Sequence, residues 1–277
     1  MSALGNILVH IDAGPHNAAR LSAARELAAR HDASVIALYA VTPAYIEVPF
    51  AMEAAGAALD ALKELDDERL RRARTLVEQV RATSGPRIEW AETDGAALFN
   101  GFLQQAFYAD LLVLGQREPE PYSSGVPGDF IESVVIGSGR PALVLPHVGV
   151  PARVGGTVLV AWKETPQAVH AVTAALPMLQ RAELVHVVSW QGEDPGSQGP
   201  LDIRAFMARH GIEAQLHRLG SEPAATTGEM MLSMAADLSA DLIVMGCYGH
   251  SRARELVLGG ATRTILASMT VPVLMAH

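Results

Sequence analysis

An internal repeat constrains the fold of this chain more than any other feature of its sequence. The segment ADLLVLG at residues 109–115 recurs as ADLIVMG at residues 240–246, 131 residues later. PALVLPH, which begins at Pro141, recurs at the same spacing as PVLMAH from Pro272. Nearer the start of each copy, NILVHID (6–12) matches TVLVAWK (157–163). The 277 residues therefore suit two domains of similar fold, of about 140 residues each.

Each copy alternates apolar strand patterns with helix patterns. In the first copy, we predict helices at 17–31, 52–81 and 96–108, and strands at 6–11, 34–41, 87–91, 111–114 and 142–145. Near-continuous apolar strands separated by helices are typical of a parallel sheet with both faces covered. We predict an α/β fold with two tandem doubly wound five-stranded domains at 1–148 and 157–277, joined by a linker at 149–156 that is rich in proline and glycine.

Composition narrows the class of partner. The formal net charge of -9 argues against general binding to nucleic acid or to an anionic membrane. The single cysteine, Cys247, cannot form an intramolecular disulfide, which favours a reducing compartment. The N-terminal segment lacks the basic region of a signal peptide, and no apolar run approaches the ~20 residues that span a bilayer. We therefore expect a soluble cytoplasmic protein.

Glycines follow the last-but-one apolar strand of the second copy. Gly246 ends that strand, and Gly249, Gly259 and Gly260 precede the helix pattern ATRTILASM. Glycine at a strand end allows backbone to approach a ligand, and free N–H groups near a helix start favour an anion. His250, Ser251, Arg252 and Arg254 lie between the glycines and could donate hydrogen bonds. These residues can form a phosphate site; alternatively, the glycines only turn the loop.

The spacing Gly-x2-Gly-x9-Gly, between a DLIVMG strand and a VPVL strand, resembles the universal stress protein A family, and the chain resembles a tandem two-domain member. The resemblance implies an adenine nucleotide alpha hydrolase-like fold, with the two terminal strands pairing antiparallel in an intramolecular pseudo-dimer. It also implies ATP or another adenine nucleotide in the C-terminal domain. The residues that would hold it are Ala161, Trp162, Lys163, Val187, Gly246, Gly249, His250, Arg252, Gly259, Gly260, Ala261 and Thr262.

Neither copy carries the complete family pattern. The aspartate that holds adenine in nucleotide-binding relatives is replaced by Lys163, and Gly260 stands where those relatives have Ser or Thr. Lys163 could reach a phosphate, pair with an acidic neighbour, or simply be solvated. It cannot accept the hydrogen bond that a carboxylate accepts.

The first copy has the opposite defect. It retains Asp12, but Glu118 and Asp129 stand opposite Gly249 and Gly260. Carboxylates beside a phosphate would repel it, so we predict no ATP in the first domain. We interpret Asp12 as a cap of the following helix or as a relic.

Other motifs are weak. The chain contains no GxxxxGK[ST], GxSxG, HExxH or CxxC, so we expect no metal and no catalytic residue. Cys247 is interpreted as a small buried residue, with a redox-sensitive thiol as the alternative. The basic cluster Arg69, Arg71, Arg72 and Arg74 follows four acidic residues and is interpreted as a solvated helix face with local ion pairs.

Our first hypothesis for function is a cytoplasmic stress-response factor that acts as a nucleotide-responsive binding module and has an unidentified protein partner. The alternative is a protein-interaction scaffold whose two pockets are both degenerate. An enzyme acting on a nucleotide is a third interpretation, which rests on fold analogy alone.

Overall fold

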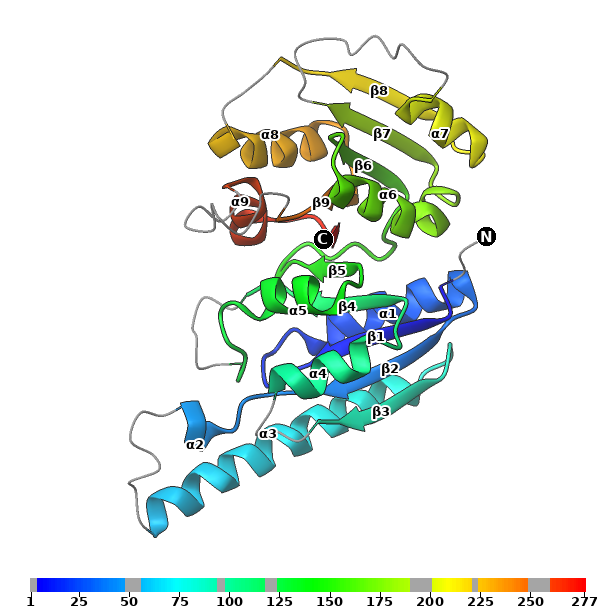
Figure 1. Cartoon of the computed structure of the whole chain (residues 1–277). Coiled ribbons are helices and arrows are strands. Elements are labelled where there is room, and N and C mark those ends of the chain that lie inside the picture. Colours follow the sequence, from blue (N-terminus) through cyan, green and yellow to red (C-terminus); the bar gives the residue numbers. More distant parts are fainter. Residues whose placement is uncertain are drawn as a thin grey trace. The chain divides into compact units, whose positions relative to one another are not determined.

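A computed structural model describes residues 4–47, 56–93, 98–117, 124–189, 201–220, 224–248 and 260–277. The described chain divides into two compact units, Leu4–Arg140 and Pro141–His277 (Figure 1). Each unit is an open α/β sheet with helices packed against it. We describe the two units separately.

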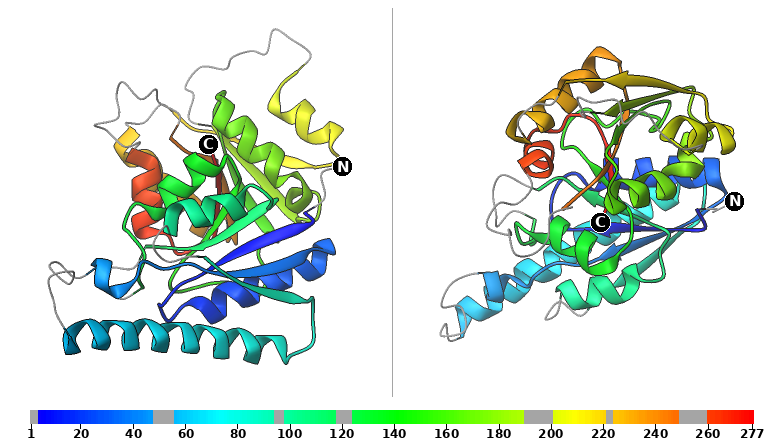
Figure 2. Two further views of the ribbon diagram at one scale, coloured as in Figure 1. Left: turned by 60° about the horizontal axis from the view of Figure 1, so that its bottom comes forward. Right: turned by 45° about the horizontal axis from the view of Figure 1, so that its top comes forward.

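The N-terminal unit alternates strands and helices in the predicted order. Its elements are β1 (Asn6–Ile11), α1 (Asn17–His31), β2 (Ser34–Tyr39), α2 (Ala44–Glu47), α3 (Ala57–Arg81), β3 (Ile88–Glu92), α4 (Leu98–Ala106), β4 (Leu111–Gly115) and α5 (Phe130–Ser138). The strands are parallel and follow the order β3-β2-β1-β4. Figure 2 shows α1 and α3 on one face of this sheet and α4 and α5 on the other.

The C-terminal unit begins with the last strand of the first copy. Its elements are β5 (Ala142–Leu145), β6 (Thr157–Trp162), α6 (Pro166–Leu179), β7 (Leu184–Ser189), α7 (Ile203–Arg209), β8 (Ala214–Arg218), α8 (Ala224–Asp237), β9 (Leu242–Gly246), α9 (Gly260–Ser268) and β10 (Val273–Ala276). The strand order is β5-β10-β9-β6-β7-β8, and every pair is parallel except one.

The exception joins the terminal strands of the two repeats. β5 runs antiparallel to β10, with Val144 opposite Val273 and Ala142 opposite Met275. All eight residues of the two strands are buried, so the pairing covers two apolar strands that would otherwise each leave an exposed edge. The predicted antiparallel pairing of the terminal strands is therefore confirmed. The compact units separate between Arg140 and Pro141. The predicted domain boundaries, with a linker at 149–156, stay a prediction.

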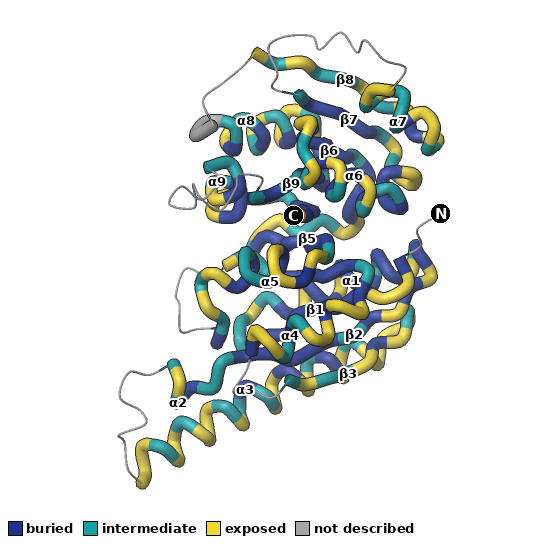
Figure 3. Tube along the Cα trace, viewed as in Figure 1, coloured by how far each residue is buried: buried dark blue, intermediate teal, exposed yellow. Residues whose placement is uncertain are grey.

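Burial explains why these segments form strands. The central strands β1, β4, β6 and β9 are buried over almost their whole length, as expected for parallel strands covered on both faces (Figure 3). The helices bury one face only. α1 and α6 bury equivalent positions, since Asn17, Arg20 and Leu21 of α1 correspond, 151 residues later, to Ala168, Ala171 and Val172 of α6.

Candidate functional site

The chain changes direction across the C-terminal sheet between β6 and β9. From β6 it proceeds to β7 and β8 on one side, and it then returns to β9 and β10 on the other. Ligands of open α/β sheets bind beyond the carboxyl ends of strands at such a switch point. Ala161 of β6 pairs with Met245 of β9, so the two strands end side by side at Trp162 and Gly246. This edge of the sheet is the candidate site.

Gly246 is required by packing. A Cβ atom at this residue would lie 2.5 Å from the backbone nitrogen of Ala168 and 2.6 Å from the carbonyl carbon of Gln167. Both atoms belong to the first turn of α6, and real Cβ contacts are essentially never so short. The absence of a side chain therefore allows α6 to begin directly over the end of β9. This packing against α6 accounts for Gly246 without a ligand.

Lys163 follows β6 at the rim of the site. Its side chain is exposed, and its carbonyl oxygen accepts a hydrogen bond from the backbone nitrogen of Thr165 across 2.7 Å. The Thr165 hydroxyl then caps α6 by accepting from the backbone nitrogen of Ala168 across 3.3 Å, and Pro166 occupies the first turn. Among the described residues, no carboxylate forms an ion pair with Lys163. The backbone of Lys163 is thus held in a tight turn while its ammonium group points to solvent.

The predicted phosphate side of the site is the start of α9 (Gly260–Ser268), which begins with Gly260, Ala261 and Thr262. Gly228 of α8 determines how closely α8 approaches this turn. A Cβ atom on Gly228 would lie 2.8 Å from Cβ of Thr264 and 2.9 Å from the carbonyl oxygen of Ala261. The first turn of α9 is therefore supported by a close contact between two helices.

The remaining predicted site residues divide into two groups. Ala161 and Val187 are buried, with 7% and 2% of their surface exposed, so only their backbone atoms could meet a ligand. Gly249, His250, Arg252 and Gly259 lie outside the described residues, as does Glu118 of the first copy. The structure thus places Trp162, Lys163 and Gly246 at one edge of the sheet, and Gly260 at the start of α9.

Cys247 has a structural environment. Only 2% of its surface is exposed, and its thiol donates a hydrogen bond to the carbonyl oxygen of Ala276 across 3.4 Å. Its own carbonyl oxygen lies 3.2 Å from Nδ1 of His277, whose ring therefore donates there when Nδ1 is protonated. The interpretation of Cys247 as a small buried residue is confirmed.

The equivalent edge of the N-terminal unit holds a buried ion pair. Arg20 of α1 donates to Oδ2 of Asp12 across 2.9 Å and to the carbonyl oxygen of His10 across 2.7 Å. Burial raises the pKa of Asp12, but the guanidinium of Arg20, the neighbouring His10 and the hydrogen bond from Gly14 together outweigh it, so the pKa lies below the usual value of 3.8. The second carboxylate oxygen accepts from the backbone nitrogen of Gly14 across 2.8 Å.

Both oxygens of Asp12 are thus already engaged. The interpretation of Asp12 as a helix cap is wrong, because α1 begins after His16 and has no side-chain cap. Asn17 instead binds the Asp12 backbone, accepting from its nitrogen and donating to its oxygen. The carboxylate serves the ion pair with Arg20.

His10 extends this cluster into the core. Burial lowers its pKa to about 4; Asp12 partly opposes and Arg20 reinforces that shift. The ring lies between Phe102 and Phe130, with centroids 5.3 Å and 4.6 Å away. Its Nε2 lies 2.8 Å from the carbonyl oxygen of Ala40, so the neutral ring carries its proton on Nε2.

Arginine side chains cover both glycines that survive in the N-terminal copy. A Cβ on Gly115 would lie 2.4 Å from a guanidinium nitrogen of Arg20, and a Cβ on Gly128 would lie 2.7 Å from the guanidinium carbon of Arg117. The cavity between them measures about 30 Å³, room for one or two water molecules. It is lined by His10, Asp12, Gly115, Gln116, Arg117, Ser124, Val126, Pro127, Gly128, Phe130 and Ile131.

The two units differ at both residues of this ion pair. Asp12 and Arg20 of the N-terminal unit correspond to Lys163 and Ala171 of the C-terminal unit, at the common spacing of 151 residues. Ala171 is fully buried, as Arg20 nearly is. The C-terminal edge therefore lacks both members of the ion pair and carries a solvent-exposed cation instead.

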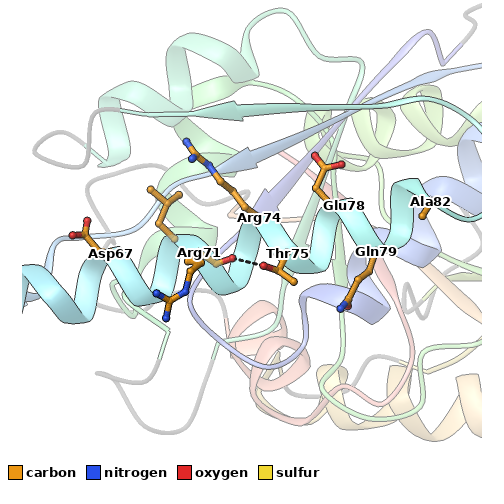
Figure 4. A pocket seen from close by; sticks show the side chains of 8 residues that line it. Asp67, Arg71, Arg74, Thr75, Glu78, Gln79 and Ala82 are labelled. Atoms are coloured by element: carbon orange, nitrogen blue, oxygen red, sulfur yellow. Dashed lines mark hydrogen bonds between the residues drawn. The ribbon is translucent and has the colours of Figure 1, made fainter.

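A larger hollow of about 580 Å³ runs along α3 (Figure 4). It is lined by Asp67, Leu70, Arg71, Arg74, Thr75, Glu78, Gln79 and Ala82. Seven of the eight residues belong to α3 and the eighth, Ala82, is its C-cap. Figure 4 shows the hydroxyl of Thr75 donating to the backbone carbonyl of Arg71, at 2.9 Å. A ligand site needs polar groups that converge from several elements, so this open face is not a candidate.

The basic cluster on α3 is only partly the solvated face that we predicted. Arg71 and Arg72 are exposed and pair with Glu68. Arg69, by contrast, is 8% exposed and pairs with Glu47 of α2 and with Asp66, at 3.1 Å and 3.3 Å. Arg69 therefore links α2 to α3, a contact that the local charge pattern cannot reveal.

Two further searches cover the described residues only. They contain no group of three or more His, Cys, Asp or Glu side chains arranged to hold a metal ion. No helix among them is long and apolar enough to cross a membrane.

Comparison with known proteins identifies the C-terminal half. Residues 156–277 match the sequence profile of the Universal stress protein family. The C-terminal half of the chain is thus similar to the universal stress protein family. Universal stress protein Slr1230 of Synechocystis sp. is 26% identical over 170 residues, which cover 60% of this chain. The match spans only 57% of that relative's length.

Solved structures extend the likeness in fold to the whole chain. A universal stress protein from Archaeoglobus fulgidus DSM 4304 superposes with a TM-score of 0.69 at 16% identity, covering 99% of this chain and 96% of its own. A functionally unknown protein from Pseudomonas aeruginosa PAO1 gives a TM-score of 0.60 at 18% identity, covering 99% and 92%. The predicted tandem fold of universal stress protein type is confirmed.

Proposed function

We propose that the C-terminal unit binds a nucleotide and that the chain acts as a nucleotide-responsive binding module in a stress response, without being an enzyme. The observation that carries the proposal is the meeting of β6 and β9 at the switch point of the sheet. The phosphates would lie at the N-terminus of α9, where Gly260 adds no side chain and the helix favours an anion.

The match of residues 156–277 to the Universal stress protein family supports a ligand of this class. The resemblance implies an adenine nucleotide such as ATP, with the base toward β6 and β7. Trp162 at the end of β6, Lys163 directly after it and the backbone of Val187 would border that base. The described part of the site offers no general base beside the expected phosphate position, which favours binding over hydrolysis.

The proposal assigns no nucleotide to the N-terminal unit. Its corresponding cavity of about 30 Å³ is far smaller than the several hundred Å³ that enclose a ligand of nucleotide size. Two guanidinium groups lie against its glycines. This observation favours a second candidate function for the N-terminal unit, as a rigid scaffold for an unidentified protein partner.

Two glycine-to-aspartate variants, one in each unit, test the location of the site. Asp129 of the N-terminal unit stands at the position equivalent to Gly260, so Gly260→Asp gives the C-terminal unit the N-terminal carboxylate. We expect the variant to lose at least about tenfold in nucleotide affinity, since a carboxylate at the helix start repels phosphate. The control is Gly128→Asp in the N-terminal unit. Equal loss in both variants, or loss only in the control, would refute the assignment.

A further inference from the structure

We propose that Lys163 makes the site selective for a 6-oxopurine, guanine or hypoxanthine, over adenine. The inference rests on the proposed function, because it assumes that a nucleotide lies at this edge. It departs from the adenine nucleotide that the family resemblance implies, and it assigns Lys163 as the residue that determines base specificity.

The first step is the position of Lys163 relative to the two ends of a ligand. The phosphate end lies at α9, which follows β9 in the chain, while β6 lies on the opposite side of β9 from β10. A ligand held by its phosphates at α9 and extended along the sheet edge therefore brings its base to the ends of β6 and β7. Lys163 is the first residue after β6.

The second step is the state of the ammonium group. Lys163 is exposed, and no carboxylate of the described chain pairs with it. In the N-terminal unit, the equivalent Asp12 is 6% exposed and is neutralised by Arg20. The C-terminal unit has Ala171 at the position of that arginine, so no side chain at the equivalent position confines the charge at residue 163. The ammonium can turn toward a ligand at little cost, whereas Asp12 would first have to leave its partner.

The third step is the hydrogen-bonding pattern of the bases. A lysine ammonium offers donors and no acceptor. The 6-position of adenine carries an amino donor, whereas guanine presents O6 and N7 as neighbouring acceptors, the pair that Lys and Arg recognise in nucleic acids. At one base orientation, a carboxylate at this strand end thus suits adenine and a lysine suits a 6-oxopurine. Replacing Asp by Lys reverses the preferred partner without moving the base.

A phosphate role for Lys163 would have a different signature. An ammonium bound to phosphate strengthens the binding of all nucleoside triphosphates alike, whatever their base. Only contact with the base changes the ratio of affinities between two nucleotides. The ratio is therefore the quantity to measure.

The experiment titrates nucleotide-stripped full-length protein with GTP, ITP and ATP. We expect GTP and ITP to bind about tenfold more tightly than ATP, the discrimination of one charge-assisted hydrogen bond. ITP carries O6 without the 2-amino group, so its agreement with GTP assigns the effect to O6. Lys163→Met should bring the ratio close to one, and Lys163→Asp should reverse it in favour of ATP. Lys63→Met, on an exposed part of α3, is the control and should leave the ratio unchanged.

The native chain offers a second readout. It contains only two lysines, Lys63 and Lys163, so partial acetylation reports on both at once by mass spectrometry. GTP should protect Lys163 more than ATP does at equal concentration, while Lys63 reacts equally in both. Tight binding of all three nucleotides with equal affinity, unchanged in ratio by Lys163→Met, would overturn the inference and leave the proposed function intact. Absence of binding by every nucleotide would overturn both.

Discussion

Arg20 of α1 binds Asp12, which directly follows β1, and both side chains are more than nine-tenths buried. The guanidinium that holds the carboxylate also lies against Gly115 at the end of β4. One arginine therefore occupies this strand edge in the N-terminal unit. In the C-terminal unit, the residue equivalent to Asp12 is the exposed Lys163. This difference between two copies of one fold is the basis of our account.

Breaking this ion pair should destabilise the N-terminal unit strongly. Arg20→Met leaves a buried carboxylate without its cation, and we expect a loss of about 3 to 5 kcal/mol in the free energy of unfolding. Fluorescence of Trp90 during urea unfolding measures this loss in a Trp162→Phe, Trp190→Phe background, where Trp90 is the remaining tryptophan.

The control for this prediction removes both charges. Asp12→Asn combined with Arg20→Met should recover a substantial part of the loss, because no buried charge remains unpaired. A single variant as stable as the parent, or a double variant no better than the single one, would show that the pair does not have the energetic role we assign.

His10 should make the N-terminal unit acid-sensitive at mildly acidic pH. Its pKa is about 4 in the folded protein against 6.5 for an exposed histidine, so the unfolded chain takes up a proton first as the pH falls. The stability contributed by neutral His10 is complete above pH 6.5 and declines between pH 6.5 and 4, by about 3 kcal/mol in all. Glutamine is neutral at every pH, so in His10→Gln the free energy of unfolding should depend less on pH in this window. Parallel curves for parent and variant would contradict the assignment.

Gly228 should be intolerant of a side chain. Alanine favours a helix over glycine by about 1 kcal/mol, but the added Cβ would meet Thr264 and the carbonyl oxygen of Ala261 at under 3 Å. Because a backbone atom is one of the two neighbours, we expect overpacking to win and to cost about 1 to 3 kcal/mol. Thermal unfolding checks this, with Gly220→Ala as the control, since a Cβ there meets nothing within 4 Å. Stabilisation by Gly228→Ala would show that α8 and α9 are less closely packed than we describe.

His186 and His217 form a pair on the neighbouring strands β7 and β8, with Nδ1 of the first 3.0 Å from Nε2 of the second. Burial and then the charge of His217 lower the pKa of His186. His217→Gln removes the second cause and keeps the first, so the pKa of His186 should rise part of the way toward 6.5. Titration of the ring proton by NMR measures it; a further fall would disprove the coupling.

Much of the fold could be predicted from the sequence because it rests on local apolar patterns. The predicted strand at 6–11 coincides with β1, and the predicted helix at 17–31 coincides with α1. The helix predicted at 96–108 is observed at Leu98–Ala106, a shift of the size expected for helix ends. Strand β8 escaped notice because Gln215, His217 and Arg218 interrupt its apolar pattern.

The candidate site was less accessible to sequence reasoning. The repeat aligned Asp12 with Lys163 and so located the contrast between the units correctly. The structural cause of this contrast is Arg20. In the sequence, Arg20 resembles a surface residue of an alanine-rich helix, and only its place on the same face as the buried Leu21 and Ala24 indicates otherwise. Arg117 over Gly128 is a contact within a loop region, and no periodic pattern reports such contacts.

The central claim is that only the C-terminal unit binds nucleotide, and the stoichiometry of the unmodified chain tests it most directly. We would strip the purified full-length protein of bound nucleotide and titrate it calorimetrically with GTP and ATP at high micromolar concentration. The account predicts saturation at one nucleotide per chain. Two per chain would contradict the closed N-terminal cavity, and no binding would contradict the nucleotide site itself.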